Sequence, residues 1–196
     1  MYIINAYILP VASGMIMALP LALFVRGFAS LRHRKLNLTT TRAHEIGASL
    51  FIMYCGGIAS VTVLGTPAAS EQLTETVNLI PFRFAYDMFY GCFAGKPAAA
   101  WINILGNIAL FVPFGFLLSL LWRGASWQKA VLLSAGFSAA VELCQLTQPA
   151  RMTDVDDVLL NSLGGFVGYL LFRLIKAGTA ETFRVTEIKT YTSEQE

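Results

Sequence analysis

The chain has 196 residues, of which 56% are hydrophobic and only 13% are charged, and its mean hydropathy is +0.60. This balance excludes an ordinary soluble domain, so the excess apolar surface is expected to face lipid. The net charge of +2 is small and the basic residues form no stripe with aromatic residues, which argues against nucleic acid as a partner.

Five apolar stretches satisfy or approach the roughly 20 residues that a membrane-spanning helix needs. In chain order they are Ile3–Val25, Ile46–Leu64, Ile102–Trp122, Ala130–Leu146 and Val155–Ile175. The fourth stretch is the shortest, and the fourth and fifth contain polar residues that a hydropathy scan would count against them. The sequence predicts an all-α, polytopic membrane protein in which residues 1–176 form one helix bundle and residues 177–196 a polar tail.

The basic residues predict the orientation of this bundle. Eleven of the fourteen Lys and Arg residues follow the first, third or fifth stretch, and only Arg83, Lys96 and Arg151 lie on the other side. Because cytoplasmic loops retain positive charge, the N-terminus is expected outside and the tail in the cytoplasm. The protein is thus expected to be a multi-pass protein of a plasma membrane.

The segment between the second and third stretches, residues 66–100, is rich in aromatic residues. It contains Pro81, Phe82, Arg83 and Tyr86, followed by further aromatic side chains. Such a density is typical of the headgroup region. We expect this loop to lie on the outer leaflet or to dip into it.

Polar residues concentrate at the outer ends of the last three predicted helices. They form three groups, each with members one turn apart on one helix face. The set comprises Asn103, Asn107, Glu142, Gln145, Arg151, Asp154, Asp156, Asp157 and Asn161. The topology places all three groups at one depth, which predicts a shared hydrophilic chamber that binds a ligand.

Structural roles compete with this functional reading for most of the set. The asparagines could serve as hydrogen-bonding contacts between helices, and the aspartates could cap the amides of the last helix. Glu142 is different, because an acidic residue inside the apolar zone costs about 2.5–3.5 kcal/mol. It should therefore face the bundle interior and bind a partner, either Arg151 or an asparagine amide.

Three glycines of the fifth stretch, Gly164, Gly165 and Gly168, form a small-residue pattern that permits close helix packing. The same pattern leaves association into a homo-oligomer open. The three cysteines have no metal-ligand spacing and suggest neither a disulfide framework nor a zinc site. No cofactor is expected, although a divalent cation would find its best ligand pair in Asp154 and Asp157.

An ordered series of motifs runs through the second half of the chain. It reads Asn78-Leu-Ile-Pro-Phe, Asn103-x-x-x-Asn107-x-x-x-Phe111-x-Pro113-x-Gly115, Glu142-x-x-Gln145 and Arg151-x-x-Asp154-x-Asp156-Asp157-x-x-x-Asn161-x-x-Gly164-x-x-x-Gly168. The series resembles the VanZ-like family over residues 78–171. This resemblance implies a bacterial cell-envelope protein associated with low-level resistance to the lipoglycopeptide teicoplanin.

Two mechanisms follow, and a third is weaker. In the favoured one, the polar residues bind a membrane lipid, a lipid-linked envelope precursor or a lipoglycopeptide. In the second, the chain is a metal-dependent enzyme acting on a polyprenyl-linked precursor, with Glu142 as the general base and Asp157 as a catalytic or metal-binding residue. A transporter is the weaker alternative, because five helices without an inverted repeat offer little material for alternating access.

Overall fold

The computed structural model describes residues 8–35, 42–64, 77–93, 97–122, 124–146 and 153–193. The helices are α1 (Leu9–Met17), α2 (Leu19–Lys35), α3 (Arg42–Ala59), the π-helical segment η2 (Ser60–Leu64), α4 (Arg83–Phe93), α5 (Pro97–Leu121), α6 (Trp127–Gln145) and α7 (Val155–Ser193). Two short strands, β1 (Val77–Asn78) and β2 (Thr153–Asp154), pair in parallel. The predicted all-α class is confirmed.

Within the described ranges, three helical segments are long and apolar enough to cross a membrane: His44–Thr62, Trp101–Leu121 and Val155–Ala177. A fourth results if α1 and α2, which meet at an angle of 40°, form one bent span. The bend falls beside Pro20, which has no N–H to donate to the preceding turn. The predicted fourth stretch, which forms α6, is not among these segments, and the count of five spans stays a prediction.

The low hydropathy of α6 has a structural reason. Its polar side chains Ser134, Ser138, Glu142 and Gln145 are all buried against the rest of the chain. In lipid, such side chains belong on the protein-facing side of a helix. The polar residues of α6 therefore mark the face that packs against its neighbours.

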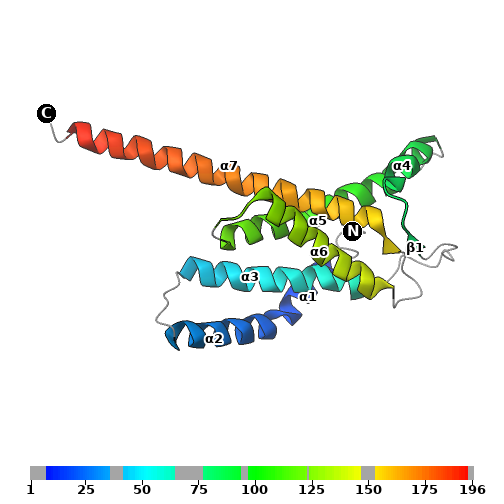
Figure 1. Ribbon diagram of the computed structural model, residues 1–196, viewed down its shortest axis with the longest axis horizontal. Coiled ribbons are helices and arrows are strands. Elements are labelled where there is room, and N and C mark those ends of the chain that lie inside the picture. Colours follow the sequence, from blue (N-terminus) through cyan, green and yellow to red (C-terminus); the bar gives the residue numbers. More distant parts are fainter. Residues whose placement is uncertain are drawn as a thin grey trace.

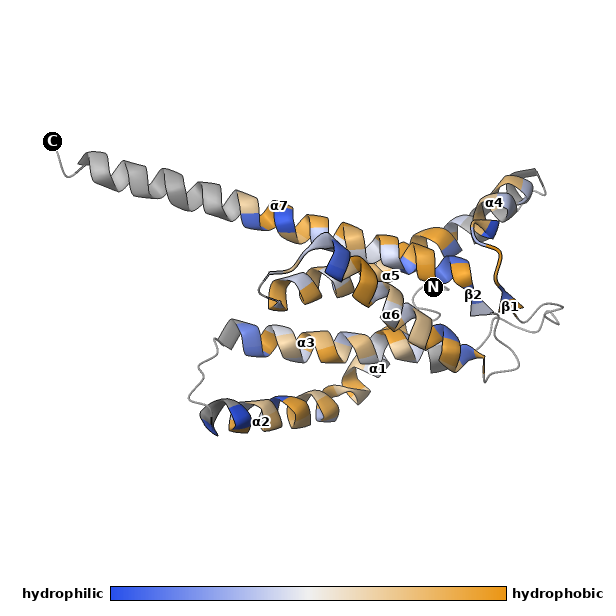
Figure 2. Cartoon of the chain, viewed as in Figure 1, coloured by the Kyte–Doolittle hydropathy of each residue, from blue (hydrophilic) through white to orange (hydrophobic). Residues whose placement is uncertain are grey.

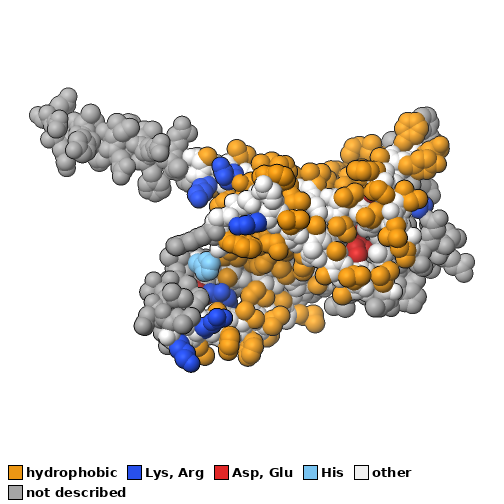
Figure 3. Space-filling model, in the orientation of Figure 1, with side chains coloured by type: hydrophobic (Ala, Val, Ile, Leu, Met, Phe, Trp, Pro, Cys, Tyr) orange, Lys and Arg blue, Asp and Glu red, His pale blue; other side chains and the backbone are white. Residues whose placement is uncertain are grey.

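The molecule has two polar ends with an apolar zone between them (Figure 1 and Figure 2). One end, here called the strand end, holds β1, β2, α4 and the first turn of α7. The other, here called the basic end, holds the C-terminal end of α2, the first turn of α3 and the turn between α5 and α6. Lys and Arg side chains gather mostly at the basic end, as Figure 3 shows.

Close contact between α5 and α7 holds the centre of the bundle together. A Cβ atom on Gly115 would lie 2.2 Å from the backbone oxygen of Gly165, and one on Gly168 would lie 2.2 Å from that of Val112. The predicted close packing at the glycines of the last span is confirmed. The glycine face is thus occupied by helices of the same chain.

Two boundaries differ from the sequence-based expectation. The aromatic segment, predicted as a loop, contains the helix α4, whose face carries the exposed side chains of Tyr86, Phe89 and Tyr90. The helix α7 continues to Ser193, past the boundary predicted at residue 176. In both cases the backbone forms a helix because a helix pairs its own N–H and C=O groups without partners from other segments.

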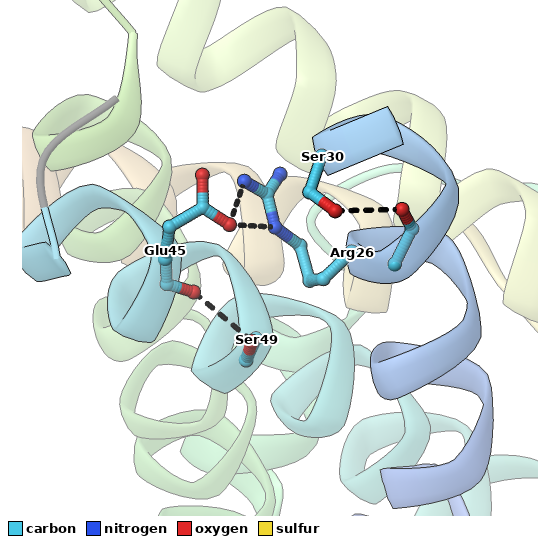
Figure 4. Close-up of polar contacts among 5 residues, drawn as sticks. Arg26, Ser30, Glu45 and Ser49 are labelled. Atoms are coloured by element: carbon cyan, nitrogen blue, oxygen red, sulfur yellow. Dashed lines mark hydrogen bonds and ion pairs between the residues drawn. The ribbon is translucent and has the colours of Figure 1, made fainter. Parts of the chain in front are cut away.

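At the basic end, α2 and α3 are joined by an ion pair between Arg26 and Glu45 (Figure 4). The guanidinium Nε donates to Glu45 Oε2 at 2.9 Å, and the Nη2 atom contacts the same oxygen. Ser49 Oγ donates to the backbone oxygen of Glu45 at 3.0 Å. The pair ties the bent first pair of helices to the first continuous span.

Candidate functional site

The strand end is organised by the pairing of β1 with β2. Val77 lies opposite Thr153, and Asn78 lies opposite Asp154, although these residues are about 76 positions apart in the chain. The Asn78 side chain is 1% exposed, and its Nδ2 donates to Asp154 Oδ1 at 2.9 Å. Its Oδ1 accepts from the backbone N–H of Ile80 at 3.1 Å. Asn78 therefore fixes the aromatic segment to the start of α7.

Glu142 is 6% exposed and faces the interior, as predicted from the cost of burying a carboxylate. Its Oε2 accepts from the backbone N–H of Asp154 at 3.0 Å. The hydroxyl of Thr153 donates to the backbone oxygen of Glu142 at 3.4 Å. One partner of the carboxylate is thus a backbone amide of β2, and Arg151, a predicted partner, lies outside the described residues.

Asp154 caps α7. Its Oδ1 accepts from the backbone N–H of Asp156 at 2.9 Å, which satisfies one of the amides left free in the first turn of the helix. Burial raises the pKa of this carboxyl, while the hydrogen bonds from Asp156 and Asn78 and the charge of Arg83 lower it. The structural role proposed for the aspartates holds for Asp154.

Asp156 caps a different helix. Its carboxylate is 2% exposed and accepts from the backbone N–H of Phe82 at 2.6 Å and from that of Phe84 at 2.8 Å. These amides belong to the start of α4, where Phe82 adopts a positive φ of 66°. One buried carboxylate on α7 therefore fixes the N-terminal end of α4.

Asp157 joins α7 to α5. Its Oδ1 accepts from Asn107 Nδ2 at 2.6 Å, and the same amide nitrogen lies 3.4 Å from Asn103 Oδ1. Asn107 is half-buried, whereas Asn103 is exposed. The predicted convergence of the last three helices is confirmed by the bonds from Asn107 to Asp157 and from Asp154 to Glu142, whereas a role of this cluster in ligand binding stays a prediction.

Two members of the predicted set point elsewhere. Gln145 Nε2 donates to the backbone oxygen of Thr62 in η2 at 2.7 Å, and Asn161 Nδ2 donates to Ser138 Oγ on α6 at 2.8 Å. Gln145 Oε1 and Asn161 Oδ1 are buried acceptors without a hydrogen bond in the described part of the chain. Asn161 therefore contacts α6 rather than the cluster around Asp157.

The sequence reasoning underrated two residues. Asn78 belongs to the Asn-Leu-Ile-Pro-Phe motif but is not among the predicted site residues, and Ser138 is also absent from that set. A polar residue before a proline-aromatic turn is a signal for Asn78, since such turns need side-chain acceptors. Ser138 offers no signal of its own, because its hydroxyl matters only as the partner of Asn161.

The described residues contain no larger cluster of metal ligands around the aspartates, and a cation held by the predicted pair stays a prediction. No group of three or more His, Cys, Asp or Glu side chains in these ranges could hold a metal ion. Asp154 and Asp157, the predicted ligand pair, bond to amides on different elements, β1 and α5. The two carboxylates therefore act as hydrogen-bond acceptors between segments.

An apolar cavity lies beside the polar cluster, against the same stretch of α5 that carries Asn103 and Asn107. It has a volume of about 680 Å³ and is lined by apolar residues of α1 and of the first half of α5, with Tyr54 of α3. The Tyr54 hydroxyl donates to the backbone oxygen of Leu110 at 2.8 Å. The cavity thus presents a hydrocarbon lining, and a polar chamber formed by the predicted residues stays a prediction.

A helical chain with three or four apolar segments of spanning length and buried carboxylates at one end of its bundle is a membrane protein. The VanZ/LLP1 family profile matches residues 51–176, and the chain belongs to this family. It is similar to Protein VanZ of Enterococcus faecium, with 30% identity over 72 residues. The similar stretch covers 37% of this chain and 45% of that relative. No solved structure matches the chain.

Proposed function

We propose that this protein is a multi-pass protein of a bacterial plasma membrane that binds an acylated envelope ligand at the outer leaflet and contributes to teicoplanin resistance. The ligand class is a lipid-linked precursor or a lipoglycopeptide. Family membership supports a role in resistance of this type. The distribution of Lys and Arg supports placing the strand end outside.

The observation that carries the proposal is the two-sided character of α5 between Trp101 and Leu110. One side of this stretch presents the amides of Asn103 and Asn107. The other side lines the apolar cavity through Ile102, Leu105 and Gly106. An acylated ligand has the same two parts, a polar head and a hydrocarbon tail, and the two sides of one helix would bind both.

The polar part would meet hydrogen-bond acceptors and amides at the edge of the cluster. Asn103 is exposed and lies beside Asn107, which is bonded to Asp157. A headgroup with hydroxyl, amide or ammonium donors suits such a surface. The tail would lie in the cavity of about 680 Å³, where burial of methylene groups contributes about 0.8 kcal/mol each.

The test is a variant that fills the cavity without disturbing the bundle. At Gly106 an added Cβ meets nothing within 4 Å, so Gly106→Leu places a branched side chain into the cavity. We expect cells that produce this variant to lose protection against teicoplanin. Gly136→Leu is the matched control, because Gly136 on α6 also has open space and does not line the cavity.

The decisive comparison is between teicoplanin with its acyl tail and the same molecule without it. We expect purified wild-type protein to bind teicoplanin more tightly than its deacylated form, and Gly106→Leu to abolish that difference. Asn103→Leu should weaken binding of both forms alike, since it changes only the polar side. Equal protection by the wild-type protein against acylated and deacylated glycopeptide would contradict the proposal.

A further inference from the structure

A second cavity lies at the basic end, away from the polar cluster and the apolar cavity. It has a volume of about 590 Å³ and lies between the end of α5, the turn between α5 and α6, and α7. Its lining includes Ser119, Trp122, Gly124, Phe172, Arg173 and Lys176. Nothing in the proposed function uses this cavity.

The charge of this cavity has one sign. Arg173 and Lys176 are three positions apart on α7, so their side chains project from neighbouring parts of one helix face. The sequence has no Asp or Glu from Ser119 to Lys129 or from Tyr169 to Ala177. Both cations are exposed, and both contribute positive charge to the lining of the cavity.

Aromatic groups hold the two cations in place. Arg173 Nη1 donates to the Tyr169 hydroxyl at 3.3 Å, and Lys176 Nζ lies 5.8 Å from the centre of the Phe172 ring. The guanidinium has five N–H donors, so one bond to Tyr169 leaves a planar fork suited to phosphate oxygens. The cations are thus positioned before any ligand arrives.

The surroundings place this cavity at the depth of lipid headgroups. Trp122 and Trp127 are 46% and 51% exposed and flank the turn between α5 and α6. Exposed tryptophans at helix ends are typical of the membrane interface. Lys129 Nζ lies 5.1 Å from the Trp122 ring and donates to the backbone oxygen of Gly124 at 3.1 Å. This lysine offsets the negative end of the α5 dipole, which would otherwise disfavour an anion.

We propose that this cavity binds the phosphate headgroup of an anionic membrane lipid. The site combines a concave surface, two cations held on one helix face and interfacial tryptophans. Basic cavities between helix ends on the cytoplasmic side are a recurrent way to bind such headgroups. The proposal does not depend on the ligand at the strand end.

The test measures lipid binding by the full-length protein in a non-ionic detergent with native mass spectrometry. Phosphatidylglycerol and phosphatidylcholine are titrated against wild-type protein and against the double variant Arg173→Gln/Lys176→Gln. Each cation near an anionic headgroup is expected to contribute about fivefold in affinity, so the double variant should bind phosphatidylglycerol roughly 30-fold more weakly. Binding of phosphatidylcholine should stay unchanged.

The matched control is Arg32→Gln/Lys35→Gln on α2, which removes two exposed cations from the same end of the molecule. We expect it to bind phosphatidylglycerol as the wild-type protein does. An equal loss in this control would show non-specific attraction and would overturn the proposal, as would unchanged binding by the double variant. Unchanged helical circular dichroism in every variant establishes that folding is intact.

A competing free anion is tested in the same titration. Inorganic phosphate at millimolar concentration is added before the lipid. If the site takes a lipid, phosphate leaves phosphatidylglycerol binding within about twofold of its original strength, because the acyl chains and the interfacial tryptophans add contacts that free phosphate lacks. Complete displacement, together with no preference for phosphatidylglycerol over phosphatidylcholine, would assign the site to free phosphate and overturn the lipid proposal.

Discussion

The two ends of this bundle differ in the exposure of their ionisable side chains. At the strand end the carboxylates of Glu142 and Asp156 are buried and accept backbone hydrogen bonds. At the basic end Arg173 and Lys176 are exposed and line a cavity. A buried carboxyl group fixes the positions of segments because its removal leaves buried hydrogen-bond donors unsatisfied, at a cost of about 1–3 kcal/mol each, whereas cations that line a cavity can contact a ligand. Substitutions at the strand end should therefore lower the stability of the fold, whereas substitutions at the basic end should weaken ligand binding.

The largest effect on the free energy of unfolding should come from a substitution at the contact between α5 and α7, in the apolar zone between the two ends. Gly115→Ala places a Cβ 2.2 Å from the backbone oxygen of Gly165, and backbone cannot move aside as a flexible side chain would. We expect a loss of about 3 kcal/mol in the free energy of unfolding, measured by thermal or denaturant unfolding in detergent micelles.

Gly136→Ala is the control for this substitution, because its Cβ meets nothing within 4 Å. The same chemical change should there be neutral or stabilising by up to about 1 kcal/mol, since alanine favours a helix over glycine. A Gly115→Ala protein as stable as the wild-type protein would show that α5 and α7 do not pack as closely as described.

A smaller loss in the free energy of unfolding is expected from a substitution at the strand end. Asp156→Ala leaves the amides of Phe82 and Phe84 without their acceptor, which costs about 2 kcal/mol. Because those amides begin α4, proteolysis within the aromatic segment should accelerate before the rest of the chain unfolds. Limited proteolysis with mass spectrometry measures this order.

Asp156→Asn is the conservative variant for that experiment. It retains one carbonyl acceptor but adds donors next to the amides, so its effect should fall between those of the wild-type protein and Asp156→Ala. Uniform destabilisation, with no early cleavage near α4, would contradict a capping role of Asp156.

The third effect is smaller and depends on pH. Burial raises the pKa of Asp154 above its ordinary value, so the folded state binds this proton more tightly than the unfolded state. The contribution to stability is therefore fully present below pH ~3.9 and is lost as the pH rises through the pKa of the folded state. Asp154→Asn should remove this dependence, because its carbonyl still accepts from Asn78 and Asp156.

The difference in the free energy of unfolding between wild-type protein and Asp154→Asn, measured from pH 3.5 upward, tests this sign. We expect the variant to gain stability relative to the wild-type protein as the pH rises. A relative loss for the variant at neutral pH would mean that the ionised carboxylate stabilises the fold.

The smallest effect on stability belongs to the basic end. Arg173→Gln/Lys176→Gln should change the free energy of unfolding by less than about 1 kcal/mol in the absence of anionic lipid, because it removes only exposed contacts such as the one between Lys176 and Phe172. The same unfolding assay measures it. A loss as large as that of Asp156→Ala would remove the contrast between the two ends.

Much of the candidate site could be predicted from the sequence because depth in a membrane follows from topology. Once the spans and the positive residues were placed, Asn107, Glu142 and Asp157 had to lie near one depth. The bonds from Asn107 to Asp157 and from Asp154 to Glu142 confirm that these segments meet. The sequence could not give the partners, since a carboxylate accepts equally well from an asparagine or from a backbone amide.

The pairing of β1 with β2 shows where prediction failed. Two-residue strands carry no periodic pattern, so nothing in the sequence marks Val77 and Thr153 as neighbours. The consequence is large for Asp156, whose role in capping α4 exists only because that pairing brings the aromatic segment next to α7.

The sequence by itself determined that this is a helical membrane protein and which end collects positive charge, because hydrophobicity and charge act on each segment independently. Only the tertiary structure decided which acceptor meets which donor and which face of α5 borders a cavity. Those outcomes depend on the rotation and spacing of packed helices, and the glycines of α7 set that spacing only once α5 lies against them.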